Sequence, residues 1–388
     1  MSNEKRYGAF LLGAAVVCVL TAPVSAQTTS GWEAQFELLR MDVKGADEHI
    51  GEVVKISETQ TTSPPQISDH VTDTPIDLNM AAKNTVRAGV TYRGAKWGGG
   101  VSGWYLRTDD ALSGHVSSPP DTVTPSSVAS EFNTVLMFNE MLTPIQNDIE
   151  ASRISPVDYQ ASGRVKTFTV DGFALVTLAG GDDTRLELVI GGKIARVRNA
   201  QDQGVSLRSF LLNAFRPLHL NNNISLSSVA EVKVDGAGPT VGWAARTSWR
   251  RLRFDASVTE SVLYATSTQS GTFTDIDDIK LAQTPTGPFI TCPLALASFG
   301  CFAVRSDWDV DRSTKTLIPI TDLQLKVLFD VTQHIAVGGS SFTSIWNNVA
   351  APPAFTMTHA DAGPGLEWDF GQRSLRFSSF GLVVNARF

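Results

Sequence analysis

Two acid–histidine pairs have the residue types that proton transfer requires. Asp69 directly precedes His70, and His359 lies two residues before Asp361. Hydrolysis at such a pair also needs a positioned nucleophile, and no motif such as G-x-S-x-G accompanies either of them. We therefore predict no catalytic residue and a chain that is not an enzyme.

Three aspartates have the spacing that opens a calcium-binding loop. Asp307, Asp309 and Asp311 occupy alternate positions, but Arg312 stands where the loop needs glycine and Ile318 where it needs a bidentate glutamate. The sequence also lacks a phosphate-binding loop, a dinucleotide fingerprint and a zinc motif. We predict no metal site and no cofactor.

Charged side chains also recur at every second position of segments that are otherwise apolar. Leu186, Leu188 and Ile190 alternate with Arg185 and Glu187. A period of two is the signature of a β-strand with two different faces. A lipid-facing arginine at the bilayer midplane costs about 2–4 kcal/mol, so in a membrane barrel these charges must point inward or lie near an interface.

These charged faces predict a barrel lumen that holds both signs of charge. Opposite charges in a narrow lumen are expected to pair, because an isolated buried charge is costly. If the lumen conducts, the charges set its ion selectivity. The alternative is a salt-bridged structural core. The predicted pore-lining residues are Arg87, Arg93, Arg185, Glu187, Lys193, Arg246, Arg253, Asp255 and Lys326.

Ten segments alternate in this way, and long and short connections follow one another between them. The expected strands are at 32–42, 85–95, 98–107, 159–178, 184–198, 228–248, 251–266, 315–330, 334–346 and 374–388. We predict an all-β protein, a transmembrane antiparallel up-and-down β-barrel of about 10 strands with short periplasmic turns and long extracellular loops. Twelve or 14 strands are the alternatives, because 159–178 and 228–248 are long enough to hide a hairpin.

Aromatic residues gather at the two ends of the expected strands, as the two membrane interfaces require. The predicted membrane-interface aromatics are Trp97, Trp249, Phe329, Phe388, Tyr264 and Trp346. The last strand also places apolar residues at every second position and ends on phenylalanine, similar to the signal that the outer-membrane assembly machinery reads. The residues of this assembly signal are Phe380, Leu382, Val384 and Phe388.

The N-terminal segment has the features of an export signal. Lys5 and Arg6 precede an apolar run that ends at a small-residue cleavage site, so we predict a signal peptide at 1–26 and a barrel at 27–388. Export favours a disulfide between Cys292 and Cys301, with two free thiols as the alternative. The net charge of −7 and the lack of a basic cluster argue against a nucleic-acid partner.

Several short segments resemble the Legionella-type major outer membrane protein family of pore-forming barrels. The resemblance begins with residues 32–39 (WEAQFELL) and 87–92 (RAGVTY), and its clearest part is 236–242 (GAGPTVG). Residues 261–264 and 318–325 are also similar. The resemblance implies an outer-membrane barrel with a porin or surface-structural role. The chain lacks the cysteine-rich character of some members.

The sequence thus predicts an exported barrel in the outer membrane of a Gram-negative bacterium. We expect a small porin-like channel for ions or small solutes, and the alternative is a non-conducting structural or adhesin-like barrel. Strand number separates the two, because eight strands leave a filled interior whereas 16 to 18 leave an aqueous channel. The expected partners are outer-membrane lipid and the barrel assembly machinery. The solute, the oligomeric state and any loop-binding partner stay open.

Overall fold

The computed structural model describes residues 31–62, 65–116, 129–137, 152–181, 183–211, 219–282, 289–290, 303–360 and 363–388. The predicted signal peptide and the predicted disulfide of Cys292 and Cys301 lie outside these residues. Within them, no helix is long and apolar enough to cross a bilayer.

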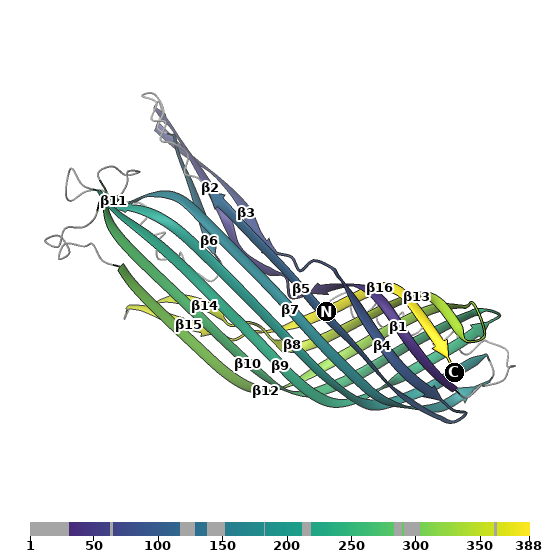
Figure 1. Cartoon of the computed structure of the whole chain (residues 1–388). Helices are drawn as coiled ribbons and strands as arrows, with labels where there is room; N and C mark the ends of the chain where they lie inside the picture. Colours follow the sequence, from purple (N-terminus) through teal and green to yellow (C-terminus); the bar gives the residue numbers. More distant parts are fainter. Residues whose placement is uncertain are drawn as a thin grey trace.

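Antiparallel strands close into a ten-stranded barrel, in which each strand pairs with the next along the chain and β1 pairs with β16 (Figure 1). The prediction of an all-β barrel with ten strands is confirmed. The register of closure places Phe36 opposite Val384. The barrel strands are β1 (Gly31–Lys44), β4 (Lys83–Arg93), β5 (Trp97–Val116), β7 (Ser152–Gly180), β8 (Thr184–Leu211), β9 (His219–Trp249), β10 (Leu252–Ala282), β12 (Ala303–Asp330), β13 (Ile335–Ala350) and β16 (Gln372–Arg387).

Five strands are much longer than the sequence pattern predicts. Strands β7 to β10 and β12 have 28 to 31 residues, whereas about 9–11 suffice to cross a bilayer. The segments 199–227 and 267–314, expected as long loops, are therefore largely strand. Their polar composition hides the alternation, but the backbones stay paired in register far beyond the apolar part of each strand.

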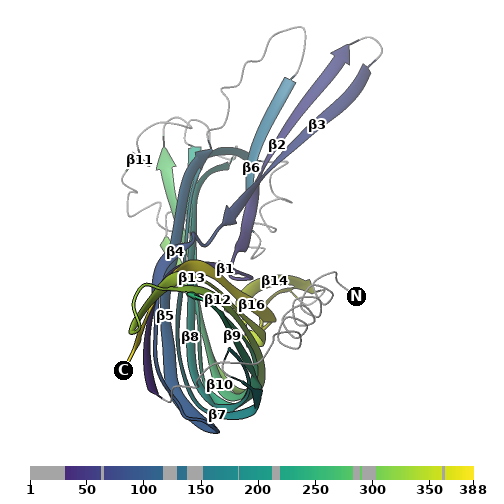
Figure 2. The same ribbon diagram turned by 90° about the vertical axis from the view of Figure 1, so that its right-hand side faces the viewer.

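Shorter strands form two additional sheets at the end of the barrel that carries the long strands. Strands β2 (Glu48–Thr62), β3 (Pro65–Leu78) and β6 (Ala129–Met137) form a three-stranded sheet in the order β3-β2-β6. This sheet projects from the barrel as an arm (Figures 1 and 2). Strands β14 (Ala354–Ala360) and β15 (Gly363–Asp369) form a separate hairpin, and β11 (Phe289–Ile290) pairs with the end of β10.

The two faces of the barrel strands exchange polarity partway along their length. On β1, Phe36 and Leu38 are exposed outside while Glu37 is buried inside. Further along the same strand, Arg40 is exposed outside while Met41 is buried inside. An apolar exterior suits lipid and a polar exterior suits water. The exchange therefore divides the barrel into a segment built for the bilayer and a segment built for solvent.

Candidate functional site: the barrel lumen

An apolar belt surrounds one end of the barrel. Large apolar side chains are exposed on its outer face, among them Trp32, Phe36, Val90, Val101, Ile190, Ile194, Val241, Trp243, Phe254, Val262, Leu325, Val327 and Leu382. Soluble monomers rarely expose a contiguous apolar surface of more than a few hundred Å². The belt therefore marks the part of the barrel that faces lipid.

Five of the aromatic residues predicted at the membrane interfaces are exposed on the outside of the barrel. They are Trp97, Trp249, Phe329, Phe388 and Tyr264. Trp346 is the exception, because it is 1% exposed and its indole Nε1 donates to Ser344 Oγ inside the barrel. The assignment of Trp346 to a membrane interface is wrong. Trp346 is in phase with the buried Phe342 and Ser344 on the same strand, and the one-residue bulge of β13 comes only after it, between Trp346 and Val349.

Glu33 is the centre of one ion-pair network in the lumen, next to the short turns. Arg246 donates to both of its carboxylate oxygens, at 2.8 and 2.9 Å. Arg93 donates to Glu33 at 2.5 Å, and Arg253 at 3.3 Å. Asp255 accepts a further hydrogen bond of 2.8 Å from Arg246. Four of the predicted pore-lining residues thus meet around one carboxylate that the prediction did not include.

Glu187 continues this network along the wall of the lumen. Its carboxylate lies 3.4 Å from Arg93 Nε and 2.7 Å from Arg185 Nε. Arg185 also donates to the backbone carbonyl of Gly94 in the turn between β4 and β5, at 2.7 Å. The network therefore fastens a turn to the lumen.

Lys193 is the centre of a second group of buried charges, which lies deeper in the barrel. Its ammonium Nζ lies 2.6 Å from both Asp171 and Asp322, which come from β7 and β12 on opposite sides of Lys193 in sequence. The lysine is 2% exposed, so these two carboxylates replace its hydration shell. The alternation of residues in the sequence assigned Lys193 to the lumen, but it did not identify Asp171 and Asp322 as lumen residues.

Glu37 is completely buried beside this group and is satisfied from several strands. Arg87 donates to it at 3.2 Å, Gln324 at 2.9 Å and Ser340 at 2.8 Å. Lys326 lies 3.9 Å from the same carboxylate and donates to Gln35 at 2.5 Å. The polar lumen is therefore cross-linked between β1, β4, β12 and β13.

Opposite charges nearly balance within the described lumen. The cations are Arg87, Arg93, Arg185, Lys193, Arg246, Arg253, Lys326 and Arg387, and the carboxylates are Glu33, Glu37, Asp171, Glu187, Asp255, Asp322 and Asp330. Every one of them has an ion-pair partner. All nine predicted pore-lining residues lie in this network. Their pairing agrees with the alternative of a salt-bridged structural core.

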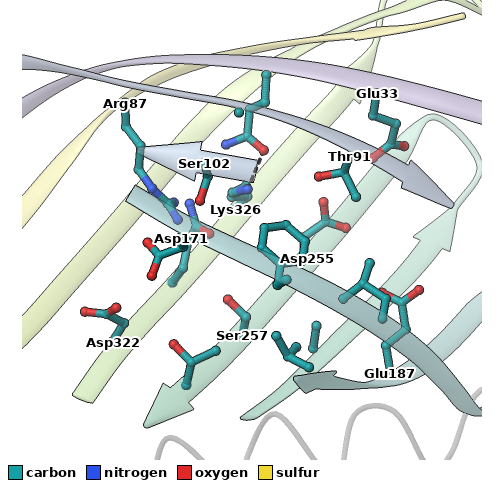
Figure 3. A pocket seen from close by; sticks show the side chains of 18 of the residues that line it. Glu33, Arg87, Thr91, Ser102, Asp171, Glu187, Asp255, Ser257, Asp322 and Lys326 are labelled. Atoms are coloured by element: carbon teal, nitrogen blue, oxygen red, sulfur yellow. Dashed lines mark hydrogen bonds between the residues drawn. The ribbon is translucent and has the colours of Figure 1, made fainter. Parts of the chain in front are cut away.

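The charged part of the lumen lines a partly open cavity of about 140 Å³. Figure 3 shows Glu33, Arg87, Asp171, Asp255 and Lys326 around it, from strands on all sides of the barrel. A water molecule occupies about 30 Å³ in the liquid, so the cavity has room for a few waters or one small ion with its hydration shell. Both charged and apolar side chains line this chamber.

An apolar layer fills the barrel above this chamber. The layer consists of buried side chains from nine of the ten barrel strands, including Leu39, Met41, Trp104, Leu106, Val165, Ala195, Val197, Val232, Val234, Leu263, Ala265, Ile318, Ile320, Phe342, Trp346, Leu375 and Phe377. These side chains are at most 3% exposed. Within the described residues, these side chains are therefore out of contact with solvent and pack against one another across the lumen.

Aromatic rings form the centre of the apolar layer. The ring of Trp104 lies 5.2 Å from that of Phe377 and 5.9 Å from that of Phe342, between centroids. Trp346 packs against Phe377 at 5.7 Å. Sequence reasoning missed this layer. The signal that could have found it is the exchange of polarity between the two faces, since Arg40 follows Leu38 on one face while Leu39 follows Glu37 on the other.

Comparisons with known proteins find solved structures of low similarity. No family model and no curated protein matches the sequence. The solved outer membrane protease OmpT from Escherichia coli is 8% identical, with 93% of this chain and 99% of that chain covered and a TM-score of 0.41. The Pseudomonas putida toluene transporter TodX is 7% identical, with 93% and 91% covered and a TM-score of 0.21. The anion-selective porin from Comamonas acidovorans is 8% identical, with 93% and 100% covered and a TM-score of 0.11.

Proposed function

We propose that the chain is an integral outer-membrane β-barrel protein with a sealed lumen, which holds a tall β-wall and a β-arm outside the membrane for contact with other surfaces or molecules. The apolar layer is the observation that carries this proposal. It supports the non-conducting alternative over the small porin-like channel that the sequence favoured.

The membrane location rests on the apolar belt. Exposed tryptophan and phenylalanine side chains surround a segment whose interior is charged, which is the reverse of a soluble barrel. Strands β1, β4, β13 and β16 have 11 to 16 residues, which matches the length needed to cross a bilayer at a tilt. The resemblance to the Legionella-type major outer membrane protein family is consistent with this location, and membership of that family is part of the proposal.

The sealed lumen rests on two arguments about free energy. An ion crossing the apolar layer would lose its hydration shell without a polar replacement, which costs many kcal/mol. The charges below the layer are held in pairs, so they stabilise the wall and offer few free sites for a permeating ion. Both arguments assign the charged residues a structural role.

The extracellular role rests on the length of the long strands. A strand of 31 residues at about 3.3 Å per residue is about 100 Å long, roughly three times the bilayer core. Figure 1 shows these strands continuing beyond the ends of β1, β4, β13 and β16. The ordered backbone pairing far from the membrane supports a role in contact with other surfaces or molecules. The projecting arm adds β3 and β6, which are the edge strands of its sheet among the described residues.

Single-channel recording in a planar lipid bilayer tests the proposal. The protein is reconstituted after a gel has shown different mobility for boiled and unboiled samples, which establishes that the barrel is folded. We expect no discrete current steps. Reproducible steps from the folded wild-type protein would contradict the sealed lumen and support the second candidate, a narrow channel, for which the cavity of about 140 Å³ is the favourable observation.

A further inference from the structure

Four cations stand directly opposite one another on adjacent strands. In the register of the barrel wall, Arg107 on β5 faces Lys166 on β7, Lys166 faces Arg198 on β8, and Arg198 faces Lys233 on β9. All four are on the outer face, since their neighbours Leu106, Val165, Val197 and Val232 are buried inside. We call these four residues the cation row.

Like charges in directly opposed cross-strand pairs destabilise a sheet. Nearby carboxylates compensate only part of the row. Glu231 accepts a hydrogen bond from Arg198 and lies 3.3 Å from Lys233 Nζ. Arg107 and Lys166 have no ion pair with any residue that the structure describes. The half of the row on β5 and β7 therefore carries unbalanced positive charge.

The pairs of residues on either side of the row do not remove the imbalance. Arg196 pairs with Asp235 on the side nearer the belt, and Arg164 stands opposite Asp109 on the other side. Together with the row and Glu231, these positions hold six cations and three carboxylates. Repulsion among these cations lowers the stability of the sheet in water, and an anion bound across them would reduce that repulsion.

The cation row lies at the upper edge of the apolar belt. The outward residues next to the row on the side of the belt are Tyr105 on β5 and Phe168 on β7, which are 51% and 45% exposed. On β8, Arg196 comes between the row and Ile194, which is 60% exposed. Exposed aromatic and aliphatic side chains of this kind sit at the boundary between lipid tails and head groups. Arg107 and Lys166 are the next outward residues on β5 and β7 and are therefore at head-group height, where lipid phosphate groups are found.

The length of the row indicates the size of the ligand. Four adjacent strands spaced about 4.8 Å apart give a row of about 14 Å, which can contact two phosphate groups of one lipid. We propose that the cation row binds the head group of a bisphosphorylated lipid in the outer leaflet of the membrane. This proposal rests on the membrane location proposed above. Arg107 and Lys166 contact the phosphate oxygens of the lipid. Arg198 and Lys233 also contact the phosphate groups while they stay paired with the carboxylate of Glu231.

Two double variants test the site, with the same loss of charge at opposite ends of the barrel. Arg107→Gln with Lys166→Gln removes the unbalanced half of the row. Lys96→Gln with Arg251→Gln removes two exposed cations at the short turns and serves as the matched control. Each protein is placed in phosphatidylcholine nanodiscs with or without bisphosphorylated lipid A. Native mass spectrometry then measures retained lipid A, and tryptophan fluorescence measures the thermal midpoint.

We expect the wild type and the Lys96/Arg251 control to retain lipid A, and the Arg107/Lys166 variant to bind it about tenfold more weakly. Lipid A should raise the thermal midpoint of the wild type and not of the Arg107/Lys166 variant. In phosphatidylcholine alone, the Arg107/Lys166 variant should be at least as stable as the wild type, because cross-strand repulsion has been removed. High salt should weaken lipid retention by the wild type.

Three outcomes would overturn the proposal. Equal lipid A retention by the wild type and the Arg107/Lys166 variant would show that the row is not the site. Equal loss in both double variants would show a general charge effect. Stabilisation of the wild type by inorganic phosphate alone, to the same extent as by lipid A, would assign the row to a free anion. Failure to enter phosphatidylcholine nanodiscs would instead contradict the membrane location, so the two proposals fail separately.

Discussion

Replacing Glu33 by glutamine tests whether the lumen is a dry structural core. Glu33 accepts hydrogen bonds from Arg93, Arg246 and Arg253, and a glutamine at this position would keep the shape but lose the charge. Removing one partner of a buried ion pair costs about 3–5 kcal/mol, because the opposite charge stays buried without compensation. We expect Glu33→Gln to lower the free energy of unfolding by that amount, measured by urea titration in lipid vesicles.

Arg253 provides the matched control for this prediction. Its Nη1 lies 3.3 Å from Glu33, but its Nε and Nη2 have no hydrogen-bond partner within the described chain. Arg253→Gln should therefore cost less than about 1 kcal/mol. The double variant Glu33→Gln with Arg253→Gln should recover part of the free energy of unfolding that Glu33→Gln loses. The reason is that one of the arginines left without a carboxylate is removed together with the anion.

The result also separates the two candidate functions. Ion pairs exposed to water contribute about 0–1 kcal/mol, and salt screens them. If Glu33→Gln costs less than about 1 kcal/mol, the lumen is hydrated like a surface and the reasoning for a sealed core is refuted. A cost of several kcal/mol that persists at high salt would agree with the low side-chain exposure of Glu33 and its three arginine partners.

Two further predictions concern the apolar layer and barrel closure. Trp104→Ala should lower the free energy of unfolding by about 3–5 kcal/mol, because it leaves a cavity between the rings of Phe342 and Phe377. Trp97→Ala, on the lipid-facing side, should cost less. Urea titration of both variants checks this, and equal losses of stability would contradict the apolar layer. Deleting Phe388 removes the backbone hydrogen bonds of 2.9 and 3.3 Å that join it to Trp32 at the closure of the barrel. We expect less heat-modifiable barrel in the outer-membrane fraction, with Phe388→Tyr close to wild type; normal assembly of the deletion would argue against the assembly signal.

Local patterns predicted the architecture because strand alternation is a local property. Apolar and polar residues alternate along β8 whatever its neighbours are, so the positions of Arg185 and Glu187 in the sequence are enough to assign them to the lumen. The order of ten strands followed from chain connectivity, since each strand pairs with the next through a short turn or a longer connection. The polar outer halves of the strands were missed, because alternation between polar residues on one face and small residues on the other is weak.

The partners within the lumen were beyond the reach of sequence, because they depend on closure and on strand register. Lys193 meets Asp322, which lies 129 residues away, and Arg253 meets Glu33 at a separation of 220 residues. Trp346 was placed at the membrane interface from its position near a strand end, but it continues the inward alternation of Phe342 and Ser344 and therefore lies in the lumen.

The sequence by itself determined that the chain forms alternating strands, that these strands build an antiparallel barrel and that charged side chains face inward. Only the tertiary structure decided what the inside of the barrel is. Ion pairs and apolar contacts form across the lumen between strands that are far apart in the chain, and their energy depends on which side chains meet at the same height. Closure of the barrel by β1 and β16 sets those heights, and it places the apolar layer above the charged chamber.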